Sequence, residues 1–171
     1  MKRMNMKSQS VILAIMLLFS TQFCTMQNGT NPDAEIDKKV ETLLTKMTLD
    51  EKIGQLTLYT SDMDQTGAFL RPEYIDDIKS GTVGSIFNAY GSEYTRKLQE
   101  MAVNGTRLGI PLLFGYDVIH GHRTIFPVPL AEAASWDLPA IKKAAEVAAA
   151  EAAAEGLHWT FAPMADVARD P

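Results

Sequence analysis

The sequence predicts an α/β fold in which parallel strands alternate with helices. Three apolar runs have the length and composition of buried strands: residues 82–87, 111–114 and 158–162. Helical patterns separate them, over residues 92–107 and over the alanine-rich residues 139–155, which Asp137 can cap and Gly156 can end. Strands that alternate with helices in this way are typical of a parallel sheet joined by crossover helices.

Helices are also predicted before the first of these strands. Apolar residues over 33–47 recur at the spacing of one helix face. Thr48 and Glu51 have the spacing of a capping box, which predicts a second, short helix. A third helix is expected to begin at Pro72, in the first turn where proline is tolerated, and to end at Gly81.

A carboxylate follows the predicted strand 111–114. The run leads through Gly115 and Tyr116 to Asp117. In enzymes built on parallel barrels, the groups that bind substrate lie just beyond the C-terminal ends of the strands. This position indicates Asp117 as a ligand-binding residue, and the alternative is a carboxylate that caps the following loop. The ring of Tyr116 can form the floor of the same site or pack against the core, and we expect it to pack against the core.

Two histidines lie in the loop that follows. His120 and His122 flank Gly121, and together with Asp117 they offer the ligand types of a metal-dependent amidohydrolase. The pair lies beyond the strand end, in a segment typical of a turn. We therefore expect the histidines to shape the loop by hydrogen bonding to its backbone, and we expect no metal ion or other cofactor.

Further charged residues near these motifs are given structural roles. Arg123 is expected to form an ion pair with a carboxylate. Asp166 follows the last predicted strand at the mouth of the same site, where a loop-stabilising role is favoured. Arg169 is expected to fix that loop as well. Glu155, at the end of the alanine-rich helix, is assigned to the protein surface without a role.

The N-terminus has the pattern of an export signal. Residues 1–23 combine a basic start, an apolar stretch too short to span a bilayer, and a small and polar end. Cys24 follows directly, where bacterial lipoproteins receive their lipid, so simple cleavage and lipidation both stay open. Residues 24–32 are predicted to be a polar tether and residues 33–171 the folded domain. The expected location is the periplasm or, for a lipoprotein, the outer membrane or cell surface.

Composition limits the partners and the size of the domain. The 171 residues are 46% hydrophobic and 22% charged, as in globular proteins. A net charge of −5 without a basic stripe argues against a nucleic-acid partner, and a lipid on Cys24 is the one membrane contact expected. A complete (β/α)8 barrel needs about 250 residues, so residues 33–171 are predicted to form only the N-terminal part of such a barrel.

The chain resembles glycoside hydrolase family 3, and in particular its bacterial β-glucosidases, in four segments: residues 43–56 (LLTKMTLDEKIGQL), 109–127 (GIPLLFGYDVIHGHRTIFP), 133–137 (AASWD) and 161–171 (FAPMADVARDP). They follow the family's order with similar spacing. The resemblance implies an exo-acting retaining enzyme that releases β-linked glucose from the non-reducing end of oligosaccharides or glycosides. In such enzymes one carboxylate attacks the anomeric carbon, while another carboxyl group protonates the leaving oxygen and later activates water.

The resemblance also implies roles for residues. Asp117 matches the aspartate that binds hydroxyls of the sugar in the cleavage subsite. The nucleophile and the acid/base belong to motifs that residues 1–171 do not contain, so this chain alone is expected to be inactive. Three alternatives remain: a β-xylosidase or β-N-acetylhexosaminidase of the same family, a metal-dependent amidohydrolase that uses His120 and His122, and a non-catalytic glycan-binding lipoprotein.

Overall fold

The computed structural model describes residues 32–164. The expected signal, Cys24 and most of the tether, as well as Asp166 and Arg169, lie outside the described residues. The chain divides into two compact units, Met1–Lys46 and Met47–Pro171. No helix within residues 32–164 is long and apolar enough to cross a membrane.

The described part of the first unit consists of the helix α2 (Pro32–Leu44) and the turn that follows it. Glu35 and Lys39, one turn apart, form an ion pair of 2.8 Å on its surface. The helix predicted over residues 33–47 is confirmed, although it ends three residues earlier than the apolar pattern suggested.

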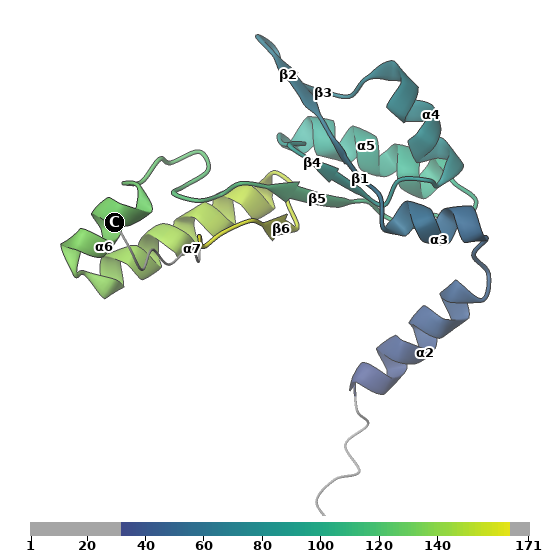
Figure 1. Cartoon of the computed structure of the whole chain (residues 1–171), viewed down its shortest axis with the longest axis horizontal. Coiled ribbons are helices and arrows are strands. Elements are labelled where there is room, and N and C mark those ends of the chain that lie inside the picture. Colours follow the sequence, from purple (N-terminus) through teal and green to yellow (C-terminus); the bar gives the residue numbers. More distant parts are fainter. Residues whose placement is uncertain (1–31, 165–171) are drawn as a thin grey trace, which may run out of the picture. The chain divides into compact units, whose positions relative to one another are not determined.

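The second unit is built on a parallel sheet (Figure 1). Its strand order is β1-β4-β5-β6, and each neighbouring pair is parallel. The bounds are β1 (Leu58–Thr60), β4 (Ser85–Phe87), β5 (Leu113–Tyr116) and β6 (Trp159–Thr160). In the centre, Ile86 lies opposite Tyr59 on one side and Phe114 on the other. The predicted α/β class with a parallel sheet is confirmed.

The strands differ from the prediction in length and position, and those expected at 82–87 and 158–162 are shorter, at Ser85–Phe87 and Trp159–Thr160. Sequence patterns assigned no strand to β1, which is only three residues long. The strand expected at 111–114 lies two residues later, because Pro111 has no N–H and Leu112 is bonded elsewhere. The amide side chain of Gln99 accepts from Leu112 N at 2.7 Å and donates to Leu112 O at 2.9 Å, in place of a neighbouring strand.

A small hairpin was also not predicted. The antiparallel strands β2 (Asp62–Asp64) and β3 (Gly67–Phe69) pair with each other between β1 and the next helix. The side chain of Asp64 accepts from Thr66 N at 2.6 Å, an Asx-type contact that closes the turn. Arg71 and Asp62 form an ion pair across the base of the hairpin.

The predicted helices are present, and their ends have the expected chemistry. They are α3 (Leu49–Gln55), α4 (Pro72–Ser80), α5 (Ser92–Gly105) and α7 (Leu138–Ala154). Asp137 accepts from Ala140 N at 3.0 Å and caps α7. Gly81 and Gly156 follow α4 and α7 with φ of 78° and 87°, as predicted for helix stops. The short helix α6 (Pro129–Ser135) was not predicted.

The core lies between the sheet and the helices that cover it. Ile78 of α4, Leu98 of α5, Ile86 of β4 and Phe114 of β5 are all buried, and Ala148 of α7 belongs to the same cluster. Figure 1 shows α4 beside α5, and α7 alongside β5 and β6. Burial of each large apolar side chain contributes about 1.5–3 kcal/mol, so the sheet and the helices stabilise one another.

One carboxylate connects the start of α3 to the segment that follows α5. Glu51 accepts from Thr48 N at 2.8 Å, while Thr48 Oγ1 accepts from Glu51 N at 3.2 Å, which completes the predicted capping box. The same carboxylate accepts from Arg107 Nε at 3.0 Å and from Arg107 Nη2 at 2.6 Å. The hydrogen bonds from Arg107, and next those from Thr48, lower the pKa of Glu51 from 4.5 to about 2.

We expect Glu51 to stabilise the fold at neutral pH and to lose this effect in acid. A carboxyl group with a lowered folded-state pKa stabilises above its unfolded value of 4.5, and the contribution disappears as the pH falls towards about 2. The variant Glu51→Gln should therefore have a lower urea midpoint than wild type at pH 7, and the difference should shrink below pH 4.5. Glu100→Gln, an exposed glutamate of α5, is the control. A gap that stays constant from pH 7 to pH 2 would contradict the assignment.

Helix α3 lies close against the chain between α4 and β4. A Cβ on Gly54 would stand 2.5 Å from Gly81 O and 2.7 Å from Thr82 Cα, both backbone atoms that cannot move independently. Only glycine therefore allows α3 to approach this segment without displacement of the backbone.

Gly54→Ala should destabilise the protein by about 1–3 kcal/mol, the usual cost of overpacking. Gly105→Ala is the matched control, because its Cβ would meet only Lys79 Cγ at 3.8 Å. There the lost flexibility of glycine should make the change neutral or stabilising by up to about 1 kcal/mol. Denaturant unfolding of both variants tests this, and equal effects would show that close approach is not the cause.

Candidate functional site

The four parallel strands end at one edge of the sheet. The residues that directly follow them are Ser61, Asn88, Asp117 and Phe161. A side-chain hydrogen bond connects the ends of β4 and β1, since Asn88 Nδ2 donates to Thr60 Oγ1 at 3.3 Å. This is the end of a parallel sheet where α/β enzymes bind their ligands.

Asp117 is the carboxylate at the centre of this edge. It follows Tyr116, the last residue of β5, and its side chain is exposed. The next residue is fixed, because Val118 N donates to Thr160 Oγ1 of β6 at 3.1 Å. Within residues 32–164, no hydrogen bond engages the Asp117 carboxylate, including any that would cap the following loop. Both of its oxygens are available to hydroxyl donors.

Aromatic rings surround the strand ends. Tyr116 packs against the core cluster, and its ring meets Tyr90 edge-on at 5.4 Å and His122 at 5.6 Å. Burial raises the pKa of the Tyr116 hydroxyl, which therefore stays protonated at neutral pH. Phe161 meets Phe87 edge-on at 5.1 Å. Aromatic rings therefore lie at the ends of β4, β5 and β6.

The segment 117–128 between β5 and α6, here called the β5 loop, has its own tight turn. Phe126 N donates to His120 O at 2.8 Å, and His120 Nδ1 lies 2.9 Å from Phe126 O. Gly121 has φ of 110°, and a Cβ there would collide with Thr124 O. His120 thus bonds to the loop backbone, in the manner expected from the sequence.

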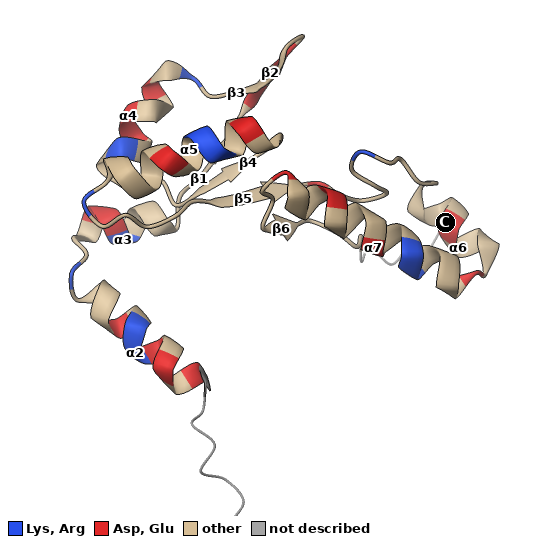
Figure 2. Cartoon of the chain, turned by 180° about the vertical axis from the view of Figure 1, so that it is seen from behind, with Lys and Arg blue, Asp and Glu red and all other residues tan. Residues whose placement is uncertain are grey.

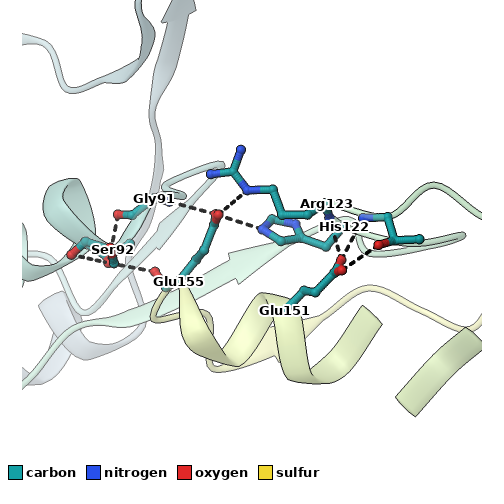
Figure 3. A network of polar contacts seen from close by, with 8 residues as sticks. Gly91, Ser92, His122, Arg123, Glu151 and Glu155 are labelled. Atoms are coloured by element: carbon teal, nitrogen blue, oxygen red, sulfur yellow. Dashed lines mark hydrogen bonds and ion pairs between the residues drawn. The ribbon is translucent and has the colours of Figure 1, made fainter. Parts of the chain in front are cut away.

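His122 is bonded differently from the prediction, whereas Arg123 forms the expected ion pair with a carboxylate. His122 Nε2 lies 2.8 Å from Glu155 Oε2 rather than at a backbone group, and Arg123 Nε forms an ion pair with Glu155 Oε1 (Figure 3). The assignment of Glu155 to the surface was wrong, because this residue is only 9% exposed. Figure 2 shows acidic and basic side chains along α7, as expected for a solvated helix, and residue type alone does not distinguish the glutamate at its end from these.

The electrostatics of Glu155 follow from these contacts. Burial alone would raise its pKa, but the hydrogen bonds from His122 and Arg123 and the charge of Arg123 outweigh burial, so the pKa is lowered. Hydrogen bonds from Thr124, from its side chain first, likewise lower the pKa of Glu151, one turn earlier on α7. Both carboxylates are thus ionised at neutral pH.

The geometry does not bring the two histidines together as metal ligands. His120 Nδ1 and His122 Nε2 are each directed to a protein partner. Across residues 32–164, no three His, Cys, Asp or Glu side chains are grouped so that they could hold a metal ion.

Comparison with known proteins gives a consistent result. The family model for the glycosyl hydrolase family 3 N terminal domain matches residues 48–171. A periplasmic beta-glucosidase of Salmonella typhimurium is 46% identical over 140 residues, which are 82% of this chain and 18% of that protein. A beta-xylosidase of Formosa agariphila is 31% identical over 88% of this chain and 17% of its own length.

Solved structures share the fold. The β-glucosidase from Listeria innocua in complex with glucose has a TM-score of 0.66 at 38% identity, over 78% of this chain and 20% of that one. A β-N-acetylhexosaminidase from Beutenbergia cavernae, with a TM-score of 0.54 at 20% identity, shares the fold alone. The chain thus spans about a fifth of the length of the Salmonella and Listeria proteins. Its match over residues 48–171 shows that it belongs to glycoside hydrolase family 3, as part of the N-terminal (β/α)8 barrel domain.

Proposed function

We propose that this chain forms the first part of the barrel of an exo-acting retaining β-glucosidase, which releases β-linked glucose from the non-reducing end of oligosaccharides or glycosides. The observation that carries the proposal is Asp117, an exposed carboxylate at the C-terminal end of a central strand. Its setting in a chain 46% identical to a periplasmic beta-glucosidase supports glucose as the sugar.

Asp117 binds the sugar in this proposal. Two neighbouring hydroxyls of glucose donate to its two oxygens, and such charge-assisted hydrogen bonds orient the ring in the cleavage subsite. The carboxylate does not attack the anomeric carbon. It raises the rate by holding the sugar where the nucleophile and the acid/base can reach it.

The two catalytic carboxyl groups belong to other parts of the polypeptide. The chain supplies about a fifth of the length of its relatives, and we propose that the nucleophile and the acid/base lie outside residues 1–171. The isolated chain is then inactive. Asp166 and Arg169 are proposed to stabilise the loop after β6 at the border of the sugar pocket.

A second candidate is a β-xylosidase, favoured by the beta-xylosidase of Formosa agariphila at 31% identity. Xylose lacks the hydroxymethyl group of glucose, so a pocket that contacts this group discriminates between the two sugars. The higher identity to a beta-glucosidase, 46%, favours glucose. Comparison of kcat/KM on aryl β-glucosides and aryl β-xylosides decides between them.

Asp117→Ala should lower kcat/KM on aryl β-glucosides by about 10²- to 10⁴-fold, because two hydrogen bonds to a charged group contribute about 1.5–3 kcal/mol each. The assay uses the product of the complete gene, and initial rates at varied substrate concentration give the constants. Asp76→Asn, an exposed carboxylate of α4, is the control and should act as wild type. If Asp117→Ala and Asp76→Asn have equal, mild effects, Asp117 does not bind the sugar.

We further propose that the protein is exported through a signal at residues 1–23, as the periplasmic location of the Salmonella relative supports. The mass of the mature N-terminal peptide distinguishes the two forms of processing. Lipidation should add the mass of a diacylglyceryl group and a fatty acid to Cys24, and Cys24→Ser should then shift the protein from the membrane to the soluble fraction. A mature N-terminus that still contains residues 1–23 would contradict export by this signal.

A further inference from the structure

Glu155 connects three separate segments of the chain. It follows α7 directly, and its Oε2 accepts from Gly91 N at 3.0 Å and from His122 Nε2 at 2.8 Å, while Oε1 accepts from Arg123 Nε (Figure 3). A carboxylate has only acceptor atoms, so its bond with His122 requires that the imidazole carries its proton on Nε2. Glu155 therefore fixes the orientation and the protonation of that ring nitrogen.

Glu151 holds the next part of the same loop. It lies one helical turn before Glu155 and therefore on the same face of α7. Its carboxylate accepts from Arg123 N at 2.8 Å, from Thr124 N at 2.7 Å and from Thr124 Oγ1 at 2.6 Å. The two glutamates together bind three consecutive residues of the β5 loop.

These contacts are connected to Asp117 in two ways, along the chain and through the packing of aromatic rings. The His122 ring meets Tyr116 edge-on at 5.6 Å, and Tyr116 directly precedes Asp117. At its start, directly after Asp117, the loop is also fixed to β6 by the bond from Val118 N to Thr160 Oγ1. The segment that begins at Asp117 is thus held on both sides.

Glu155 also fixes the segment after β4. Gly91 N donates to its side chain, and Thr95 Oγ1 donates to its backbone oxygen at 2.8 Å. Gly91 directly follows Tyr90, whose ring meets Tyr116 edge-on at 5.4 Å. One carboxylate therefore sets the segments after two adjacent strands relative to each other.

We propose that Glu155, assisted by Glu151, is a positioning residue of the sugar site: it holds the β5 loop and the segment after β4 in the arrangement that presents Asp117 to substrate. The inference rests on the proposed function and adds a residue to it. Glu155 acts from the helix side through His122, Arg123 and Gly91, and has no contact with substrate in this role.

Glu155→Gln tests the role with minimal change of size. The carboxylate accepts hydrogen bonds from three donors with its two oxygens. An amide has only one acceptor oxygen, so its NH2 group must face at least one of these donors, and that hydrogen bond is lost. Glu146→Gln is the matched control, because Glu146 lies on the same helix with its side chain 51% exposed and pairs only with Lys142 and Lys143 within the described part of the chain.

The experiment measures kinetics and loop protection on the product of the complete gene. For Glu155→Gln we expect KM for an aryl β-glucoside and Ki for glucose to rise together, at least tenfold, under conditions where the variant is fully folded. Amide hydrogen exchange over residues 118–126 should accelerate at least tenfold, with no change in α4. Glu146→Gln should leave all three quantities as in wild type.

The outcomes separate the inference from the proposed function. A variant with a lower Tm but wild-type KM, Ki and loop exchange would show that Glu155 only stabilises the fold, and would overturn the inference. If Glu155→Gln does not fold, Glu151→Gln serves as the test. We then expect KM, Ki and the amide exchange rate of the loop each to rise about threefold. Wild-type values of all three would contradict the inference. A wild-type enzyme that hydrolyses no β-glucoside would overturn the proposed function, and the exchange data alone would then decide whether Glu155 holds the loop.

Discussion

A carboxylate buried at the C-terminal end of a helix is in an unfavourable position, because desolvation and the negative end of the helix dipole both oppose its charge. Glu155 has this position at the end of α7. Donors from Gly91, His122 and Arg123 offset the cost. Since these donors belong to the segments after β4 and β5, the carboxylate is satisfied only when both segments are in place. The need to satisfy one buried charge thus couples the two loops that lead to the candidate site.

The parts of the fold that the sequence predicted have local causes. The capping box of Thr48 and Glu51, the cap at Asp137 and the stops at Gly81 and Gly156 each depend on residues within one helical turn, and each is present. The elements that were missed depend on distant partners. Strand β1 has three residues and exists through its pairing with β4, which lies 27 residues later in the chain at each paired position. Short strands of this kind have too few residues to show a period.

In the candidate site, too, the features with local causes were predictable and those that depend on distant partners were not. The location of Asp117 was predictable because it directly follows a strand, and the C-terminal end of a parallel strand is a general binding position. The role of Glu155 was not predictable by the same route, since 33 residues separate it from His122 and only the packing of α7 brings them together. A weaker signal was present in the spacing of Glu151 and Glu155, two acids on one face of a helix end that is otherwise alanine.

Asp117 and Glu155 differ in the one property that decides what a carboxylate can do. Glu155 has its oxygens occupied by protein donors and is ionised by them, so it can support a loop but cannot bind a ligand. Asp117 is exposed, and no group within residues 32–164 occupies its oxygens. Because the β5 loop is held by α7 and β6, the loop requires no hydrogen bond from Asp117 itself. Support from the helix side is therefore what leaves a strand-end carboxylate available for a ligand.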